Sequence, residues 1–562
     1  MCGIAGLIGI DTGARGLIEQ LTHRGPDGIR VEDSVGRSLA HARLSIIDLE
    51  TGWQPLHAAG STIIGNGEIY NYVELAEEFQ LKDKLATGSD FEPLLHIYAQ
   101  EGERAFDRLR GMYAFCLIGA DGRVWLARDP FGIKPLYIRA SESAVAFASE
   151  PRVFGRPLIA APILRQVARL HYSVERDTAW PGVRRLAPGE IVEITGGKLK
   201  PLRTRPPLPQ PRIQAGDEEE ALAALDRVLE DSVRVHQRAD VPYGLFLSGG
   251  IDSAAIATMM ARLNERPVIS YTCGFDAPSA RDERAQAERV AKALNLDWQE
   301  VTFRAEDFWA IAPQVAWAMD DPVADYACLP TYKLAQAAKA RLTVVLTGEG
   351  GDELFAGYGR YRRALRPAWL GGRDAEPQLD ALDSSDDVLA AWRRAAAAPL
   401  GLPPLQRAQW SDVAAWLPND LLLKLDRCLM AHGLEGRTPF LDAEVAAFAF
   451  HLPDRLKVRG RFGKYLLRAW LARHCPAAEP WARKRGFTVP VADWIAPRAQ
   501  ALSKCLPEVG TVRAAYDAET IRAIFADDAH AAARWPLVFL GLWGLIHLEG
   551  ARPEEAMQAL AG

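Results

Sequence analysis

The chain has 562 residues, of which 49% are hydrophobic and 25% are charged, and its formal net charge is −6. This length fits two to four domains of the usual ~100–200 residues, and the composition is typical of a globular protein. The mildly acidic balance provides no basic surface, which excludes nucleic acid and anionic membrane as partners.

No run of the chain reaches the ~20 apolar residues that a bilayer requires. The nearest candidate, Trp535–Leu548, contains a proline, two glycines and a histidine, so we expect a buried helix there. The N-terminus has no basic region followed by an apolar stretch, and no signal peptide is predicted. The seven cysteines form no C-x-x-C pair, which argues against a disulfide framework or metal knuckles and favours the cytoplasm.

Short strands separated by turns fill the first ~200 residues. The clearest are Ile4–Ile10, Ser38–Ile47, Ser61–Ile64, Phe115–Ile118 and Val124–Ala127. The last two are joined by Gly119–Arg123, in which Asp121-Gly122 is a favourable hairpin turn. Such a density of short strands indicates antiparallel sheets packed on one another, and we expect this fold for residues 2–198.

A proline-rich stretch follows, with Pro201, Pro206, Pro207, Pro209 and Pro211. Because proline lacks the N–H group that a helix or an inner strand requires, residues 199–216 are expected to be a linker. Strands then alternate with helices, which predicts a parallel sheet in a second domain, residues 217–550. Its expected elements are helix Asp217–Arg238, strand Tyr243–Leu247, a helix from Ser253, strand Val268–Phe275, helix Asp282–Leu294, and strands Trp298–Phe303 and Leu342–Leu346. From Ala368 the chain is mostly helical.

Cys2 becomes the first residue if the initiator methionine is removed. Its free α-amine, with a pKa near ~8, would then act as general base for its own thiol. Four motifs follow in order: His23-Arg24-Gly25-Pro26-Asp27, His41-Ala42-Arg43-Leu44-Ser45-Ile46, Asn66-Gly67-Glu68-Ile69-Tyr70-Asn71 and Gly88-Ser89-Asp90. Over roughly residues 2–195 the chain closely resembles class II glutamine amidotransferase domains.

This resemblance implies an N-terminal nucleophile-type αββα sandwich in which Cys2 attacks the side-chain amide of glutamine. Arg43 would hold the glutamine α-carboxylate, for which a planar guanidinium is suited, and Asp90 would hold its α-ammonium. The side-chain amide of Asn66 and the backbone N–H of Gly67 would form the oxyanion hole, where one donor is worth ~3–4 kcal/mol. The implied glutamine-binding set is Arg43, Asn66, Gly67, Glu68 and Asp90.

Two glycine-rich loops follow apolar strands in the second half. Leu247–Ser253 has the sequence Leu-Ser-Gly-Gly-Ile-Asp-Ser and opens a helix; its N–H groups and the helix N-terminus favour an anion. It lacks the lysine of a Walker A loop. The second loop, Thr347–Tyr358, combines glycines with carboxylates. In a parallel sheet both loops lie at the carboxyl ends of their strands, where ligands bind.

Together the two loops resemble the PP-loop ATP site of the asparagine synthetase family, which splits ATP between its α- and β-phosphates. The resemblance continues through Lys424–Asp442 and Gly463–Arg468, and so runs from residue 2 to about 550. It implies ATP as a substrate and Mg²⁺ as its metal, for which Asp252 and Asp352 are the best ligands. The implied ATP-binding residues are Phe246, Ser248, Gly249, Gly250, Asp252, Ser253, Cys273, Thr347 and Gly348.

Two further roles come from the same resemblance. Glu349 would assist adenylate formation or ammonia attack, and Lys464 would stabilise charge on the transferring phosphates. The acceptor pocket has no clear motif, although the acidic segment Asp320–Asp325 is a candidate for its border.

The leading hypothesis is the activity of the glutamine-hydrolysing asparagine synthetase family: aspartate, ATP and glutamine give asparagine, glutamate, AMP and pyrophosphate through a β-aspartyl adenylate. The alternative keeps the machinery and amidates another carboxylate in a peptide, antibiotic or polysaccharide pathway, because a fold does not identify an acceptor. A catalytically silent homologue would be expected to lack Cys2, Asp252 or Glu349, and all three are present. A homodimer is left open.

Overall fold

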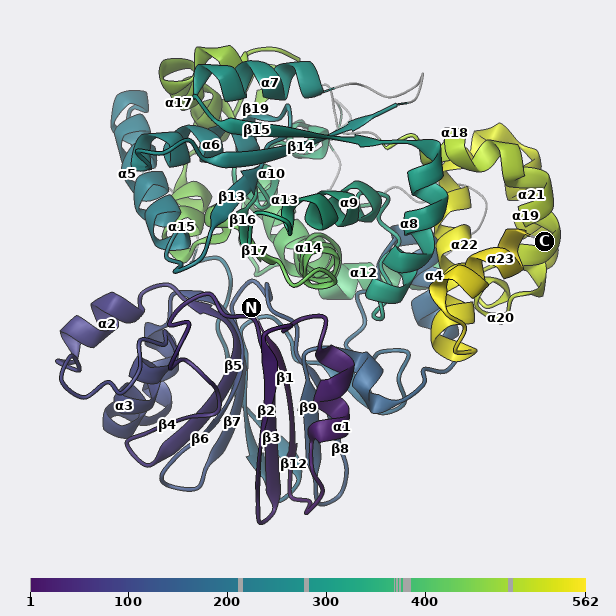
Figure 1. Cartoon of the computed structure of the whole chain (residues 1–562). Coiled ribbons are helices and arrows are strands. Elements are labelled where there is room, and N and C mark those ends of the chain that lie inside the picture. Colours follow the sequence, from purple (N-terminus) through teal and green to yellow (C-terminus); the bar gives the residue numbers. More distant parts are fainter. Residues whose placement is uncertain are drawn as a thin grey trace.

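The computed structural model describes residues 2–210, 216–276, 283–367, 369, 372, 376–377, 386–483 and 489–561. Figure 1 shows the N-terminal half, in purple and blue, as packed sheets below the parallel sheet of the second half, in teal and green. The last helices, in yellow, lie beside that second sheet. The predicted fold class, antiparallel sheets followed by a parallel sheet and a helical C-terminal part, is confirmed.

Two six-stranded antiparallel sheets form the N-terminal half. The first has the order β10 (Val183–Arg185), β8 (Tyr137–Ala140), β9 (Val145–Ala148), β1 (Gly3–Ile8), β3 (Arg37–Arg43), β2 (Gly28–Ser34). The second has the order β12 (Lys198–Thr204), β11 (Glu190–Thr195), β7 (Val124–Arg128), β6 (Gly111–Ile118), β5 (Ser61–Ile69), β4 (Leu56–Ala58). Inward-facing side chains of both sheets, such as Ile4 and Ile64, form the core between them.

Helices cover the outer faces of the two sheets. Helix α1 (Arg15–Ile18) contacts β1 and β3, while α2 (Tyr72–Glu78) and α3 (Glu92–Glu101) pack on the second sheet. This gives the αββα layers that the family resemblance implied. The predicted hairpin turn is also present, because Gly122 has a φ of +79° and donates to the carbonyl of Gly119 at 2.9 Å.

The expected linker, residues 199–216, starts too early. Its first residues belong to β12, which lies at the edge of its sheet. Pro201 is accepted there, opposite Val192 and beside a register irregularity, since an edge strand has N–H groups that need no partner. Residues 211–215 of the expected linker lie outside the described residues.

A five-stranded parallel sheet organises the second half, in the order β15 (Asp297–Phe303), β14 (Ile269–Phe275), β13 (Tyr243–Phe246), β16 (Val344–Leu346), β17 (Glu435–Arg437). Helices α5 (Glu218–His236), α6 (Ile251–Leu263), α7 (Arg284–Ala293) and α17 (Tyr465–His474) share one hydrophobic cluster with it. Helices α8 (Ala305–Ala318), α9 (Cys328–Ala338) and α14 (Leu422–Met430) share the other. Strand β17 was not expected, because its three residues include two charged side chains and carry no apolar run.

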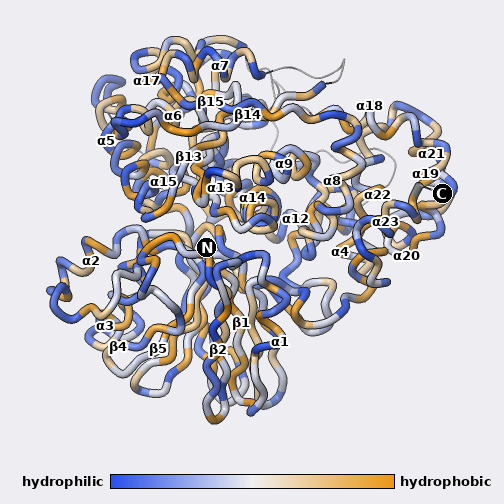
Figure 2. Tube along the Cα trace, viewed as in Figure 1, coloured by the Kyte–Doolittle hydropathy of each residue, from blue (hydrophilic) through white to orange (hydrophobic). Residues whose placement is uncertain are grey.

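Helix α5 shows how local signals set a boundary. The side chain of Asp217 accepts from the N–H of Glu220 at 2.8 Å, and the acidic first turn favours the positive end of the helix dipole. Along α5, hydrophobic and hydrophilic residues follow each other with the repeat of an amphipathic helix, which packs one face on the core (Figure 2).

The apolar segment near the C-terminus is a core helix, as expected. Residues Asp528–Leu548 are long and apolar enough, by composition, to cross a membrane, but 72% of their most apolar window is buried inside the protein. Helix α22 (Ala531–Trp543) accounts for most of this segment and packs on α8 and on α4 (Ala161–Leu170).

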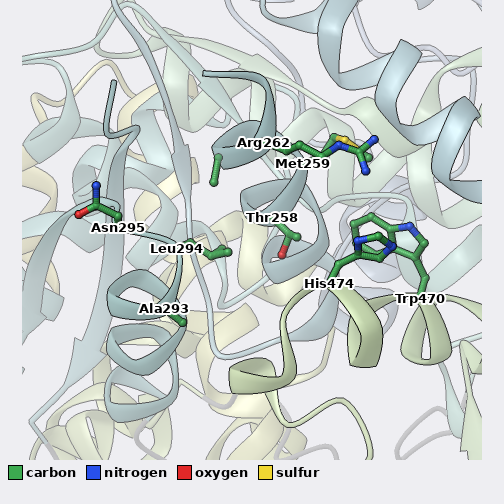
Figure 3. A pocket seen from close by; sticks show the side chains of 9 residues that line it. Thr258, Met259, Arg262, Ala293, Leu294, Asn295, Trp470 and His474 are labelled. Carbon is green, nitrogen blue, oxygen red and sulfur yellow. The ribbon is translucent and has the colours of Figure 1, made fainter. Parts of the chain in front are cut away.

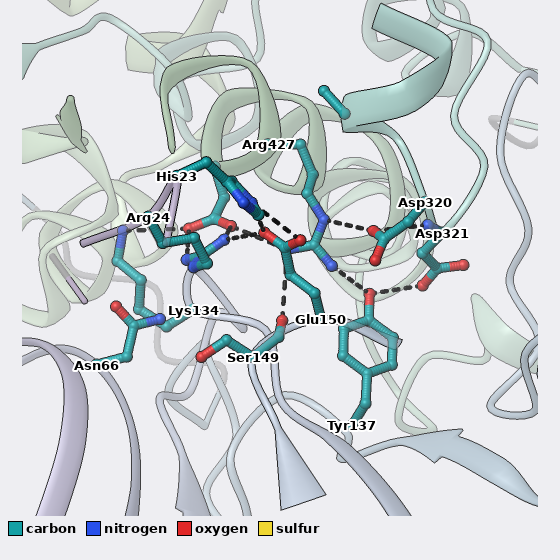
Figure 4. A network of polar contacts seen from close by, with 12 residues as sticks. His23, Arg24, Asn66, Lys134, Tyr137, Ser149, Glu150, Asp320, Asp321 and Arg427 are labelled. Atoms are coloured by element: carbon teal, nitrogen blue, oxygen red, sulfur yellow. Dashed lines mark hydrogen bonds and ion pairs between the residues drawn. The ribbon is translucent and has the colours of Figure 1, made fainter. Parts of the chain in front are cut away.

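Buried ion pairs join the two halves of the chain (Figure 4). The guanidinium of Arg24 contacts both carboxylate oxygens of Asp426, at 2.8 and 3.1 Å, and Glu150 at 2.9 Å. Beside it, Nε of Arg427 donates to Asp320 at 2.9 Å. Every one of these side chains is 2% exposed or less. Since Asp426 and Arg427 lie on α14, this helix brings buried charged side chains of the second half to the interface with the N-terminal sheets.

We expect Arg427→Met to lower the free energy of unfolding by roughly 3–5 kcal/mol, because it removes the buried cation nearest to Asp320 and leaves Arg152, at 3.3 Å, as the remaining ion-pair partner of that carboxylate among the described residues. Chemical denaturation followed by tryptophan fluorescence measures the change. Arg15→Met is the matched control: its pair with Glu19 is 65% and 55% exposed, and such pairs contribute at most about 1 kcal/mol. Equal effects of the two substitutions would contradict the importance of the interface.

Candidate functional site

Cys2 lies directly before β1 with an exposure of 9%. Its backbone nitrogen donates to Oδ1 of Asn66 at 3.1 Å, and its thiol donates to the carbonyl of Leu44 at 3.8 Å. Burial raises the pKa of the Cys2 thiol above its usual value. The sulfur therefore keeps its proton in the resting protein and needs a base before it can act as a nucleophile.

Asn66 and Gly67 lie within β5, next to Cys2. Nδ2 of Asn66 is buried and has no hydrogen-bond partner among the described residues, so this amide has a donor to spare. Gly67 has a φ of +140°, and a Cβ there would lie 2.0 Å from the carbonyl oxygen of Met112. Only glycine fits this close approach of β5 to β6.

Arg43, the last residue of β3, is buried near Cys2. Its guanidinium donates to the carbonyl oxygens of Asp48 and Leu49 and lies 4.8 Å from the ring centroid of Trp53. These contacts hold the guanidinium in place and leave it positively charged near the sulfur.

Two buried carboxylates, Asp90 and Glu68, lie in the same region. Asp90 accepts from the N–H of Ile69 at 2.7 Å, while Glu68 pairs with Arg437 of β17 at 3.1 Å. Burial raises the pKa of Asp90 to about 7, and burial together with Asp90 raises the pKa of Glu68. Glu68 thus connects the N-terminal site to the parallel sheet, whereas Asp90 is free of any ion pair among the described residues.

The first glycine-rich loop connects β13 to α6. The N–H of Ser248 and that of Gly250 donate to serine hydroxyls of the loop itself, Ser253 and Ser248, each at 3.1 Å. The N–H of Gly249 donates to Glu283 at 3.3 Å. No side chain caps the first N–H groups of α6, so the loop can exchange these internal bonds for bonds to an anion.

The second loop follows β16 and interlocks with the first. A Cβ on Gly348 would lie 2.8 Å from the nitrogen of Ser253, and one on Gly351 would lie 2.6 Å from Oδ1 of Asp252. Both positions are therefore restricted to glycine by the contact between the loops. This contact brings Asp252 of the first loop to Asp352 of the second.

Lys464 joins these two carboxylates. Its Nζ pairs with Asp252 and with Asp352, at 2.6 Å from the latter, and the side chain is 3% exposed. A Cβ on Gly357 would lie 1.8 Å from Asp352 and 2.1 Å from Cε of Lys464. Lys464 itself has a φ of +54°, a left-handed conformation that costs energy in a residue with a side chain.

The residues present fit Mg²⁺ if phosphates accompany it. Two carboxylates that face one point are hard oxygen ligands of the kind Mg²⁺ prefers. Within the described parts of the chain, no group of three or more His, Cys, Asp or Glu side chains is placed to hold a metal ion. A magnesium ion at Asp252 and Asp352 would thus take its other ligands from phosphates and water.

A cavity of about 950 Å³ opens beside the two loops. Among the predicted site residues, those that line it are Ser248, Gly249, Gly250, Asp252, Asp352 and Lys464. Those that do not are Phe246, Ser253, Cys273, Thr347, Gly348 and Glu349. Phe246, Cys273, Thr347 and Gly348 lie instead along or just after β13, β14 and β16, the three central strands of the sheet.

The lining residues outside the predicted site include Asp325, Asp420 and Lys424. Of the segment Asp320–Asp325, which was expected to border the acceptor pocket, Asp325 lines the cavity, whereas Asp320 is turned into the interface toward Arg427. The sequence distinguishes Lys424 only as part of the motif Lys424–Asp442. Nothing in the local sequence distinguishes Asp420 from an ordinary helical aspartate.

A smaller cavity of about 320 Å³ lies between α6, α7 and α17 (Figure 3). It contains none of the predicted site residues. Its one arginine, Arg262, pairs with Asp226 at 2.8 Å and with Glu230, and the rings of Trp470 and His474 stack on each other. These groups satisfy one another, and we assign the cavity no role.

Comparison with known proteins agrees with this division into two sites. The glutamine amidotransferase domain model matches residues 1–204, and the asparagine synthase model matches residues 224–547. The chain is 32% identical to a Mycobacterium tuberculosis protein, with 98% of both chains covered. It is 32% identical to asparagine synthetase 1 of Bacillus subtilis, covering 85% of this chain and 84% of that one. For asparagine synthetase B of Escherichia coli the values are 28%, 88% and 83%.

Proposed function

The chain belongs to the asparagine synthase family of glutamine-dependent ligases, and we propose that it amidates the β-carboxylate of aspartate through an aspartyl adenylate. The observation that supports this most is the joining of Asp252 and Asp352 by Lys464 beside a cavity large enough for a second substrate. An adenylating site needs both parts.

In the N-terminal half, the nitrogen that bonds Asn66 becomes the α-amine of Cys2 once Met1 is removed. This amine accepts the proton of Sγ, and the sulfur attacks the amide carbon of glutamine. Negative charge then develops on the amide oxygen, where Nδ2 of Asn66 and the N–H of Gly67 donate. The amine returns its proton to the leaving ammonia, and water releases glutamate from the thioester.

In the second half, the N–H groups of Ser248 and Gly250 leave their serine partners and bind the phosphates of ATP. The acceptor carboxylate attacks the α-phosphorus and pyrophosphate departs, with Lys464 compensating its charge. Bound Mg²⁺, held by Asp252 and Asp352, would neutralise further phosphate charge. Ammonia then displaces AMP from the adenylate, and Glu349 accepts its proton.

The ammonia released at the first site needs a path to the second site that excludes bulk water. Protonated ammonia has no lone pair and cannot attack the adenylate, so transfer through bulk water would waste it. The extensive burial at the interface between α14 and the N-terminal sheets supports a dry path there.

A second acceptor class is favoured by one observation, the extent of the cavity. Its wall continues past the loops to Tyr172, Trp392 and Tyr516, and the predicted adenosine-binding residues do not border it. A volume of about 950 Å³ lies at the upper end of ordinary ligand sites. This leaves room for an acceptor larger than aspartate.

Cys2→Ala should abolish glutamine-dependent synthesis while synthesis from added ammonia continues at a near-normal rate. The physical reason is that Cys2 acts only on glutamine. Product formation with each nitrogen source measures the two rates, and an equal loss with both would contradict the two-site assignment.

The apparent KM for glutamine should rise as the pH falls through about 7. The pKa of Asp90 is raised to about 7 by burial, so below that pH its carboxyl group is neutral and no longer attracts the glutamine ammonium. Glutaminase assays over a pH series separate this effect on KM from the effect of the α-amine of Cys2 on kcat. In Asp90→Asn the KM should be high and independent of pH near 7; a KM that still follows pH would assign the titration to another group.

Aspartate should stimulate exchange of labelled pyrophosphate into ATP without any nitrogen donor, because adenylation is reversible and precedes ammonia attack. Asp252→Asn should lower the exchange by orders of magnitude and leave the glutaminase at Cys2 intact. If aspartate gives no exchange while another carboxylate does, the acceptor is the wrong one and the adenylating site is right. Normal exchange in Asp252→Asn would refute the placement of the metal.

A further inference from the structure

The indole of Trp53 packs against the arginine that is expected to bind the α-carboxylate of glutamine. Cζ of Arg43 lies over the ring, 4.8 Å from the ring centroid, and Cζ of Arg30 lies over the same side chain at 5.2 Å. The two arginines differ in burial, because Arg43 is 2% exposed whereas Arg30 is exposed to solvent. None of the sequence motifs includes Trp53, and the proposed chemistry does not use it.

The backbone around the indole leaves room for it beside Arg43. Gly28 of β2 lies opposite Arg43 of β3, and a Cβ there would lie 3.0 Å from Cη2 of Trp53. Because Gly28 has no side chain, the indole occupies the position that a cross-strand side chain would otherwise take. A Cβ on Gly52 would lie 3.1 Å from Nη2 of Arg43 and 2.9 Å from the carbonyl oxygen of Asp48. Two glycines thus let the loop and the ring close around one guanidinium.

Hydrogen bonds fix the loop that carries Trp53. The guanidinium of Arg43 donates to the carbonyl oxygen of Asp48, and the backbone nitrogen of Trp53 donates to that of Thr51 at 2.8 Å. The carboxylate of Asp48 accepts from the N–H groups of Thr51 and Gly88, at 2.8 and 2.7 Å. Gly88 begins the segment that carries the carboxylate proposed to hold the glutamine ammonium. One loop therefore joins the two groups that would recognise the amino acid part of glutamine.

The guanidinium of Arg43 keeps donors for a substrate. Two of its N–H groups donate to the carbonyl oxygens of Asp48 and Leu49; the others have no acceptor among the described residues and can bind a carboxylate. Burial lowers the pKa of Arg43, because it disfavours the charged form. The aromatic face offsets part of this cost, since it attracts a cation. The indole also excludes water beside the guanidinium, which strengthens the attraction of a carboxylate.

Restraint of this guanidinium should act on binding rather than on the chemical step. A flexible arginine side chain that is held in one orientation before glutamine arrives loses less entropy on binding. The groups proposed to act on the amide, Cys2, Asn66 and Gly67, belong to β5 and to the residue before β1. Loss of the indole should thus raise the KM for glutamine and leave kcat largely unchanged.

We infer that Trp53 is a positioning residue for glutamine hydrolysis: its indole holds the guanidinium of Arg43 in the orientation that pairs with the α-carboxylate of glutamine. Selection for an α-carboxylate then depends on an aromatic side chain as well as on the arginine. The inference goes beyond the proposed function and rests on its glutamine site, but it is independent of the acceptor at the second site.

The test is glutaminase activity with two substrates that differ in one group. L-glutamine carries the α-carboxylate, and 4-aminobutanamide has the same amine and amide without it. In the wild-type protein, kcat/KM should favour L-glutamine by orders of magnitude, because the other substrate leaves Arg43 unpaired. Trp53→Leu should raise the KM for L-glutamine by roughly 10-fold, with a smaller change in kcat. Its kcat/KM for 4-aminobutanamide should stay at the wild-type value, so that the preference for the α-carboxylate falls.

Two variants serve as matched controls. Trp53→Phe keeps an aromatic face beside Arg43, so it should retain most of the preference that Trp53→Leu loses. Arg30→Lys removes the other guanidinium from the ring and keeps its charge, so the preference should stay at the wild-type value. Far-UV circular dichroism and the melting temperature report whether each variant is folded. Where Trp53→Leu is not folded, Trp53→Met provides the comparison, because it also fills the space without an aromatic face.

The outcomes separate the inference from the proposed function. A wild-type protein that hydrolyses neither substrate, or both equally well, refutes the glutamine site of the proposed function and the inference with it. A clear wild-type preference that Trp53→Leu leaves unchanged overturns the inference alone. An equal loss of kcat/KM for both substrates also overturns it, because the ring would then only support the fold. The same holds if Trp53→Phe is no better than Trp53→Leu, or if Arg30→Lys loses as much of the preference.

Discussion

The structure depends on one buried set of ion pairs, those of Arg24 and Arg427 with Asp426, Glu150 and Asp320. Desolvating so many charges offsets most of their mutual attraction, and an apolar interface of the same area would hold the halves together as well. What the ion pairs add is a fixed register of one half against the other, because a shift of one residue at the interface would leave several charges buried and unpaired. The relative position of the two sites follows from this register.

Helix α14 extends from this interface to the cavity, and it therefore fixes the position of one site relative to the other. Asp426 and Arg427 face the N-terminal half, where Arg24 also donates to the carbonyl of Cys2 at 3.3 Å. Lys424, two residues earlier on the same helix, faces the cavity and pairs with Asp325. The segment that contains Asp320 and Asp325 runs alongside in the same way, with one carboxylate at the interface and one in the cavity. Two rigid elements thus connect the sites, with an ion pair at each end.

Sequence alone predicted most of the elements, and it named most of the charged residues that the structure brings together at the two candidate sites, since both depend on local patterns. Alternating apolar strands and helices identified the parallel sheet, and the glycine-rich loops identified Asp252 and Asp352. It did not predict β17, whose place depends on the buried pair of Arg437 with Glu68 from the other half. It also missed Asp420, because what sets this residue apart is an oxygen without a donor, a property of its surroundings in space. The prolines also predicted a wrong start for the linker, because Pro201 lies on the edge strand β12.

Asp90 and Asp420 show the same physical arrangement at the two ends of the molecule. Each is a buried carboxylate whose pKa is raised by burial, and Asp90 is proposed to hold the ammonium group of glutamine. Holding a proton in the ligand-free state avoids the cost of a buried unpaired charge. The arriving ammonium then displaces the proton and gains a charge-assisted hydrogen bond at low dielectric, where such bonds are strong. A neutral analogue has no such gain, because it leaves the proton in place. At Asp90, the proposed selection for an amine thus follows from burial together with the absence of an ion-pair partner among the described residues, and it needs no additional side chain to reject other substrates.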